Sequence, residues 1–284
     1  MSVLLTTPIF TQRGLLTYDE VTTDDETLAR LPDGELVWTP VTGISVVESQ
    51  DMIVVEAPRA TFCCSYDQRV WIARRRQSGM STRELLTTLP ERRQQDRVIF
   101  SGSYFGGYKG RRSHMSTPEA KILALLVAGH GEFYQANGET HLSFRRSAAL
   151  PAWFLKVMLE GVEARNYGDE WVIEPSKSRR MERLAVERPL VPTIFNIDAE
   201  RREEFLMTFF ALPIPEPPPD LIHLACYLCN LMIDSSVNGY RKMAGTVLLQ
   251  EATYGTINED AWSVTTEAGG WTVHQDGHYM AIAT

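Results

Sequence analysis

The chain has 284 residues, of which 44% are hydrophobic and 23% are charged, a composition typical of a globular protein. No apolar run approaches the roughly 20 residues that a membrane-spanning helix needs, and the first residues lack the basic start of a signal peptide. We therefore expect no membrane association and a cytoplasmic protein. The formal net charge of −8 disfavours proteins that grip duplex DNA over a long face, because those usually carry a basic surplus.

The charge is distributed unevenly along the chain. Residues 69–112 contain 11 Lys and Arg against 3 Asp and Glu, a local charge of +8, so the remaining residues carry −16. Two interpretations stay open: a segment that binds a polyanion or an acidic protein, or a solvated linker rich in arginine. The candidate contacts for a polyanion are Arg74, Arg75, Arg76, Arg92, Arg93, Lys109, Arg111 and Arg112.

The first part of the chain has the patterns of short strands. Residues 1–76 alternate apolar and polar side chains, and Pro32-Asp33-Gly34 is a hairpin signal. Residues 77–116 are typical of a basic, glycine-rich linker, in which "STRELLTTLPERR" (81–93) favours a short helix.

Helix signals dominate residues 117–240. Thr117 is the expected N-cap of a helix that ends at Gly129, and Asn137-Gly138 predicts a hairpin. Further helices are expected in "LPAWFLKVMLEGV", "DAERREEFLMTFFAL" and "PDLIHLACYLCNLMI", with a strand and a polar stretch in "DEWVIEPSKSRRMERL". Residues 241–284 return to strands and glycine turns. The predicted fold class is therefore α+β, a β module built from both chain ends with an α+β module inserted between them.

The cysteines and histidines predict no metal or redox site. Cys63 and Cys64 lie in a strand-like run, and Cys226 and Cys229 lie in an apolar helix, so buried reduced thiols are favoured. The six histidines predict no metal site either, and we expect no cofactor. The acidic run Asp24–Glu26 fits either a cation site or a solvated loop, of which the loop is favoured.

Five stretches, taken in order, resemble an intein, or HINT domain, that carries a LAGLIDADG homing endonuclease. "TTPIFTQRGLLTYDEVTTDDETLARLPDGELVWTPV" resembles the first intein block, and "CCSYDQRVWIARRR" stands where the family has its Thr-x-x-His block. "EDAWSVTTEAGGWTVHQDGHYMAIAT" resembles the closing block. Between them, "LALLVAGHGEF" is similar to the first LAGLIDADG motif, and "FLMTFFALPI" occupies the place of the second.

The residues at the splicing positions of the resemblance do not fit the splicing chemistry. Ser2 stands at or near the first nucleophile, with only Met1 before it, and a Ser can do that work. The block histidine corresponds to Gln68, which cannot shuttle a proton near neutral pH. The terminal Asn corresponds to Thr284, after which no segment follows to be joined. We therefore expect no splicing, although an acyl shift at Ser2 stays open.

The nuclease positions are also altered. The resemblance implies one metal-binding acid at the end of each LAGLIDADG helix, and these positions correspond to His130 and Pro213. Imidazole is a poor Mg²⁺ ligand and proline offers none. Glu132 and Glu216 are nearby acids past the helix ends, and "PIPEPPPD" replaces the second half of the DNA-binding sheet. We expect no DNA cleavage.

The resemblance predicts a domain order and a function. The domains are a HINT-like β module (1–76), a linker (77–116), a LAGLIDADG-like insert (117–240) and the closing part of the β module (241–284). The expected protein is catalytically inactive and repurposed as a structural or binding component, with a bacteriophage virion, in the tail or baseplate, as its setting. Its partners are then other virion or assembly proteins, met in the host cytoplasm. A nucleic-acid binder or residual nuclease using residues 69–112 is the alternative.

Overall fold

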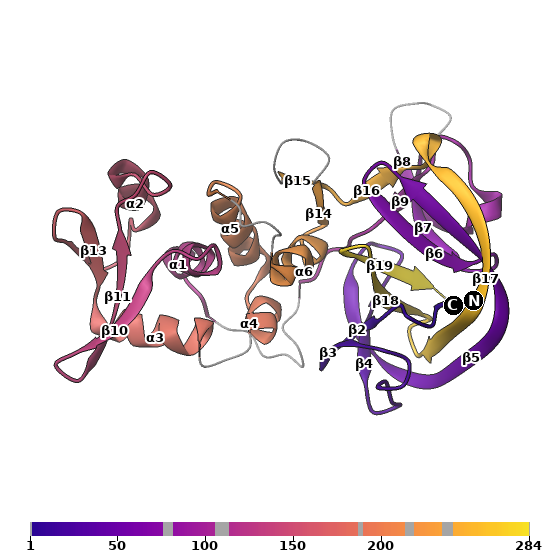
Figure 1. The fold of residues 1–284 in the computed structure, drawn as a ribbon, viewed down its shortest axis with the longest axis horizontal. Coiled ribbons are helices and arrows are strands. Elements are labelled where there is room, and N and C mark those ends of the chain that lie inside the picture. The colour runs from indigo at the N-terminus through magenta and orange to yellow at the C-terminus, as the bar shows by residue number, and fades with distance from the viewer. Residues whose placement is uncertain are drawn as a thin grey trace. The chain divides into compact units, whose positions relative to one another are not determined.

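The computed structural model describes residues 2–75, 82–105, 114–186, 190–213, 219–234 and 241–283. The chain divides into two compact units (Figure 1). The first comprises Met1–Phe105 and Cys226–Thr284, so both chain ends contribute to it, and the second comprises Gly106–Ala225. None of the described helices is long and apolar enough to cross a bilayer.

Strands make up the first unit. One sheet of 13 strands follows the order β1-β17-β5-β4-β2-β18-β19-β7-β9-β16, with β3 on β2, β6 on β5 and β8 on β7. The strands β14 and β15 form a separate ribbon. The bounds are β1 Val3–Leu4, β2 Ile9–Thr11, β3 Gly14–Leu16, β4 Glu26–Arg30, β5 Leu36–Ala57, β6 Ala60–Ser65, β7 Arg69–Arg75, β8 Thr82–Thr88, β9 Arg97–Ile99, β14 Leu231–Asp234, β15 Arg241–Ala244, β16 Thr246–Leu248, β17 Thr253–Thr266, β18 Gly270–Gln275 and β19 His278–Ala283.

Two tryptophans lie at the centre of this unit's core. Trp262 on β17 and Trp271 on β18 are fully buried, with ring centroids 6.1 Å apart. Trp262 Nε1 donates a hydrogen bond to the carbonyl oxygen of Thr7 over 3.0 Å, which satisfies the indole N–H inside the core. Trp262, Val264 and Thr266 alternate with more exposed residues along β17, whereas residues 270–273 of β18 are all buried; both segments are strands, as the sequence predicts.

The segment after β7 differs from the sequence-based prediction. Thr82–Thr88 forms strand β8, not a helix, and pairs antiparallel with β7, with Arg74 opposite Arg83. A short 3-10 helix, Leu89–Glu91, and strand β9 follow. Pairing with a neighbouring strand outweighs the local helix signal of this stretch. The β-branched residues Thr82, Thr87 and Thr88 also favour a strand. Part of the predicted linker therefore belongs to the sheet.

The return to the first unit also comes earlier than the predicted residue 241. Helix α6 (Asp220–Leu228) crosses the boundary, and Cys226 is the first residue after it. The Tyr227 hydroxyl and the Thr272 hydroxyl lie 2.7 Å apart, and the Tyr227 ring packs against Tyr279. These buried contacts place the end of α6 with the β strands.

The second unit combines a four-stranded antiparallel sheet, in the order β10-β11-β13-β12, with five helices and the start of α6. Helix α1 packs against α5, and α3 packs against β11. The sequence missed α3, whose few apolar positions lie in a polar stretch, and α4, whose seven residues (LVPTIFN) are short for a helix and contain a proline. The bounds are α1 Thr117–Val127, β10 Glu132–Ala136, β11 Glu139–Arg145, α2 Ala152–Met158, β12 Ala164–Asn166, β13 Glu170–Ile173, α3 Pro175–Ala185, α4 Leu190–Asn196 and α5 Ala199–Phe209.

Local signals explain the boundaries of α1 and the following hairpin. The N-cap is Ser116, one residue before the predicted Thr117, and it forms a reciprocal capping box with Glu119. The predicted Asn-Gly turn is confirmed: Asn137 and Gly138 have φ of +52° and +78°, and Ala136 pairs with Glu139.

Candidate functional site

The buried turn that follows β6 holds the N-terminal residues. Ser2 is 1% exposed, and its backbone N–H donates to Ser65 Oγ over 2.8 Å. The Ser65 N–H donates back to the Ser2 carbonyl oxygen over 2.9 Å. Ser2 Oγ donates to Gln50 Oε1 over 3.1 Å. The candidate nucleophile is thus fixed by three hydrogen bonds inside the first unit.

The same turn holds the final strand. Gln68 is fully buried, and its Nε2 donates to the carbonyl oxygens of Ala283, over 2.6 Å, and Arg69, over 3.0 Å. The Gln68 Oε1 atom is buried without a described hydrogen-bond partner. Ser65 to Gln68 therefore bridges the two chain ends, which lie side by side in Figure 1. Thr284 lies outside the described residues.

The proton-transfer groups at this turn are hydroxyls and one carboxylate. Ser65 Oγ donates to Asp67 Oδ1 over 2.6 Å. Burial alone raises the pKa of Asp67, but this hydrogen bond helps to hold the pKa below its usual value, so Asp67 is ionised at neutral pH. None of the described hydrogen bonds of Ser2 or Gln68 involves an imidazole. Near neutral pH the turn can orient a peptide but has no group at Gln68 to protonate a leaving amine.

The neighbouring cysteines do not replace Ser2 as nucleophiles. All four cysteines are free, and Cys63, Cys64 and Cys226 are buried. Burial raises the pKa of Cys63 to about 11, with a smaller contribution from Glu259. Burial also raises the pKa of Cys64 and Cys226. These three thiols stay protonated near neutral pH and are weak nucleophiles.

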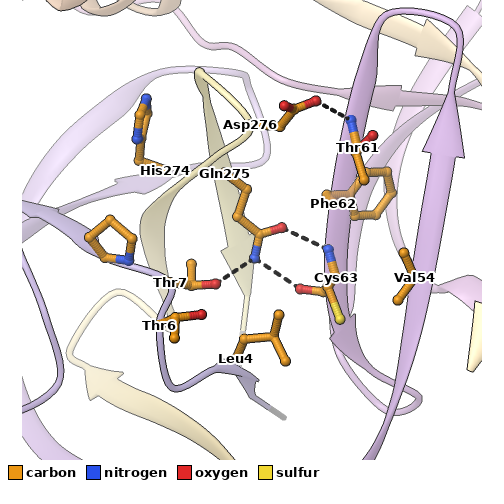
Figure 2. A pocket seen from close by; sticks show the side chains of 11 residues that line it. Leu4, Thr6, Thr7, Val54, Thr61, Phe62, Cys63, His274, Gln275 and Asp276 are labelled. Carbon is orange, nitrogen blue, oxygen red and sulfur yellow. Dashed lines mark hydrogen bonds between the residues drawn. The ribbon is translucent and has the colours of Figure 1, made fainter. Parts of the chain in front are cut away.

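A pocket of about 350 Å³ lies between β6 and the β18–β19 hairpin. Figure 2 shows Gln275 across it: Nε2 donates to Thr7 Oγ1 over 3.1 Å and to the Cys63 carbonyl over 2.9 Å, and Oε1 accepts the Cys63 N–H over 2.7 Å. Gln275 is thus used in tying the strands together. His274 also lines the pocket, whereas His278 is not among its lining residues. The two histidines do not converge on one ion.

In the second unit, the two helices matched to LAGLIDADG motifs, α1 and α5, pack together, with Lys121 Nζ 3.6 Å from Glu204 Oε1. His130 follows α1, and partial burial lowers its pKa, so the imidazole is neutral near pH 7. Pro213 follows α5 and is exposed, and Glu216 lies outside the described residues. Counted from the C-caps Ala128 and Phe210, the residue equivalent to His130 is Leu212, one before Pro213. Neither Leu nor Pro can ligate a metal.

The second unit's sheet has a buried face and an open face. Leu142, Phe144 and Ile173 are buried on one face, and the strand register puts the alternate side chains on the other. The charged members of the open face are Glu132, Glu139, Glu170, Arg145 and Arg165. Arg145 lies 3.7 Å from Glu170 and Arg165 lies 3.3 Å from Glu174, so neither arginine adds an unbalanced positive charge. In the described part of the chain, no three His, Cys, Asp or Glu side chains group closely enough to hold a metal.

The structure places four of the eight basic candidates. Arg74 makes a bidentate ion pair with the buried Asp96, at 2.9 and 2.7 Å. The Arg92 guanidinium lies over the Tyr254 ring, 3.6 Å from its centroid. Arg75 and Arg93 are exposed or partly exposed on the same unit. Arg76, Lys109, Arg111 and Arg112 lie outside the described residues.

Two of the residues at the candidate site have a local sequence signal. Ser65 and Asp67 precede Gln68 in "SYDQ", a turn-forming composition. Gln50 had none, because it is 48 residues from Ser2 and only the long β5 strand brings it there.

Neither a protein-family model nor a curated protein matches the sequence. Solved structures similar to this one include a splicing-inactive variant of the AceL NrdHF class 3 split intein, with a TM-score of 0.40 and 9% identity over 100% of this chain and 97% of that one. Another is a bacterial intein-like domain from Clostridium thermocellum, with a TM-score of 0.28 and 15% identity over 35% of this chain and 66% of that one. Both neighbours are inteins or intein-like, and at these TM-scores neither likeness carries an argument about this chain.

Proposed function

We propose that the chain is an intein-like β module with a LAGLIDADG-like insert that has lost both chemistries and serves as a structural or binding component. The observation that carries the proposal is the Ser65–Gln68 turn. It holds Ser2 and Ala283 in the arrangement that an intein-like module needs to bring two ends together. A glutamine stands where the resemblance expects the histidine.

The geometry of the turn supports loss of splicing. Ser2 is held by hydrogen bonds, but the Nε2 atom of the buried Gln68 donates its hydrogen bonds to the Ala283 and Arg69 carbonyl oxygens. An amide neither accepts nor releases a proton near neutral pH, so the scissile amide gains no acid catalysis. The turn contacts segments from both chain ends, and Gln68 supplies no proton-transfer group at the position where the resemblance expects a histidine.

The second unit supports loss of cleavage on separate grounds. The helix pair is present, but its ends carry a neutral imidazole after α1 and apolar residues after α5. The open sheet face has three glutamates against two paired arginines, so it does not attract phosphate. This argues against the nucleic-acid alternative, as does the ion pair of Arg74 with Asp96.

The virion setting is the part of the proposal that the resemblance alone supports. The expected location is the tail or baseplate of a bacteriophage, and the expected partners are other phage proteins. Mass spectrometry of purified bacteriophage particles tests this setting, and we expect the chain to be present in them in a stoichiometric amount. Absence from the particles contradicts the setting.

Activity is tested with the full chain carrying an added segment at each end. We expect the extensions to stay intact after incubation with thiol or hydroxylamine, and supercoiled DNA to stay uncut with Mg²⁺ or Mn²⁺. A ligated product, a released extension or metal-dependent cuts contradict the proposal. Retention on a DNA column at low salt favours the nucleic-acid alternative instead.

A further inference from the structure

Strand β5 has one edge that is unpaired over its middle part. Along one side it pairs with β17 from Val41 to Glu56. Along the other, β4 pairs with it up to Pro40 and β6 pairs with it only from Met52 onward. Among the described residues, no strand fills the interval between them. Figure 1 shows β5 curving around the outside of the first unit with β17 beside it.

Within this interval, residues 42–47 are uncharged, β-prone and at least partly exposed, whereas Val41 is buried and its N–H already donates to the Asp25 carbonyl. Its sequence from Val41 to Val47 contains no charge and no proline, the devices by which proteins usually protect such edges. Ile44, Val46 and Val47 are 38%, 50% and 44% exposed. An edge with unpaired backbone groups and exposed β-branched side chains is a template for another extended strand.

The interval has a defined end. Ser49 has a φ of +52°, its N–H donates to Asp260 Oδ1 over 3.1 Å, and its carbonyl accepts from Asn258 Nδ2 over 3.2 Å. The register against β17 shifts at the same place, between Glu259 and Ala261. This bulge, fixed by side chains of β17, limits the pairing edge to about six residues, or roughly 20 Å of extended chain.

The charges at the two ends of this interval indicate which kind of strand can pair with it. Exposed carboxylates lie at the bulge end of the interval: Glu48, Asp51, Glu259 and Asp260. At the other end, Asp24 adjoins Asp25, whose carbonyl accepts the Val41 N–H, and Glu267 follows the Thr266 that pairs with Val41. A second copy of this chain, paired antiparallel, brings acidic ends against acidic ends. A strand with alternating apolar residues and flanking Lys or Arg meets opposite charge at both ends.

We propose that residues 42–47 of β5 form a docking edge for an extended, basic-flanked segment of a partner protein, which adds a strand to the sheet. The inference deepens the proposed binding role and rests on it. The partner's backbone supplies hydrogen bonds to the edge, its alternate side chains cover Ile44 and Val46, and its basic residues neutralise the acidic ends.

The test uses the full chain and a fluorescent peptide of about nine residues, Lys-Lys-Val-Thr-Val-Thr-Val-Lys-Arg, followed by anisotropy at low and high salt. Three control peptides accompany it: Glu in place of every Lys and Arg, a scrambled order, and N-methylation of alternate residues, which removes one row of N–H donors. Hydrogen exchange of residues 42–47 with and without peptide locates the site.

Two lysine variants provide the matched comparison. Val46→Lys alters the edge, and Val157→Lys on α2 alters a residue of similar exposure, 50% against 48%, in the other unit. We expect binding of the basic peptide, protection within residues 42–47, weakening by salt, and a loss of about tenfold or more in Val46→Lys alone. Thermal unfolding of both variants checks that they are folded, and Glu48→Gln supplies a second, milder variant with an expected loss of affinity.

Several outcomes overturn the proposal. They are no binding by any peptide, equal binding of the N-methylated or scrambled peptide, or equal binding by Val46→Lys and the parent chain. A concentration-dependent dimer of the parent chain that Val46→Lys abolishes assigns the edge to a second copy instead. Each of these results leaves the tests of splicing and cleavage untouched, so the proposed loss of chemistry stands or falls separately.

Discussion

Gln68 Nε2 donates a hydrogen bond to the Ala283 carbonyl over 2.6 Å, so the turn after β6 is linked directly to the end of β19. The neighbouring Ser65 is bonded to Ser2 in both directions. The four-residue turn Ser65–Gln68 therefore helps to close the first unit, together with the pairing of β1 with β17 and of β19 with β18 and β7.

This closure predicts the effect of Gln68→Ala. The variant leaves the Ala283 and Arg69 carbonyls without their side-chain donor in a buried site, so we expect a loss of about 1–3 kcal/mol in the free energy of unfolding. Hydrogen exchange of residues 280–283 measures the local effect, which we expect to be the largest in the chain. Gln135→Ala, at an exposed position of β10, is the control. Equal exchange in the two variants contradicts the role of Gln68 in holding β19.

The Arg13–Asp25 pair predicts a dependence of stability on pH. Asp25 is 2% exposed and receives two hydrogen bonds of 2.7 Å from Arg13. These bonds lower the pKa of Asp25, helped by the Thr22 N–H and opposed by burial. Because the folded pKa lies below the unfolded value of about 3.9, the stabilisation is present above that value and is lost as pH falls through the folded pKa.

Asp25→Asn therefore destabilises the protein most near neutral pH, by about 1–3 kcal/mol. Urea unfolding from pH 7 to pH 3 measures the difference from the parent chain, which we expect to shrink below about pH 4. Asp169→Asn, at a side chain that is 89% exposed, is the control and should show little difference at any pH. A difference that stays constant to pH 3 shows that the ionised pair is not its cause. The same pair bears on the acidic run Asp24–Glu26, for which a cation site and a solvated loop were both considered. Asp25 is bound to Arg13, which argues against the cation site.

Two glycines beside His130 give a matched pair of variants. Both have positive φ, +81° at Gly129 and +92° at Gly131. A Cβ on Gly129 meets nothing within 4 Å, whereas a Cβ on Gly131 lies 2.7 Å from Phe144 Cε1. We expect Gly129→Ala to cost about 1 kcal/mol of backbone strain and Gly131→Ala to cost about 1–3 kcal/mol more, because the fully buried Phe144 must move.

Thermal or urea unfolding of the two glycine variants measures this difference. Similar losses would mean that the turn relaxes without pressing on Phe144. The comparison also bears on why the Gly-His-Gly turn is kept. Gly131 is required by the packing of β11, independently of any chemistry at His130.

The sequence predicted the elements whose signals are local. The Asn137-Gly138 hairpin, the helix before Gly129 and the strands around Trp262 and Trp271 each depend on turn chemistry or periodicity within a few residues. The prediction failed where a contact with residues distant in the sequence determines the local structure. Residues 82–88 become a strand because β7 is available for pairing, and α6 ends in the first unit because Tyr227 finds Thr272 and Tyr279.

The candidate site shows the same division. Ser2 and Gln68 were found by aligning motifs, but the residues that hold Ser2 come from β5 and β6 and were not predicted. Likewise, the local surplus of arginine left two interpretations open, a segment that binds a polyanion or an acidic protein and a solvated linker. In the structure Arg74 pairs with the buried Asp96, 22 residues away. Such pairings depend on tertiary geometry that a single sequence does not contain.

The buried thiols predict a loss of stability at alkaline pH. Burial raises the pKa of Cys63 to about 11 and raises that of Cys64 further, whereas an unfolded thiol ionises near pH 8.5. Above that pH the unfolded chain releases protons that the folded chain retains, so the free energy of unfolding falls by about 1.4 kcal/mol per pH unit for each such thiol. The effect is absent below about pH 8, where both states are protonated.

Cys64→Ala isolates one of these thiols. The variant loses some stability at every pH through the cavity it leaves, but that loss does not depend on ionisation. We therefore expect the parent chain and the variant to converge by about 1.4 kcal/mol per pH unit between about pH 9 and pH 10.5 in urea unfolding under reducing conditions. Iodoacetamide labelling of the folded chain at pH 8 should be slow at Cys64 and Cys226 and fast once urea unfolds the chain. Parallel stability curves, or rapid labelling of Cys64 in the folded chain, would show that the thiol is not held protonated by burial.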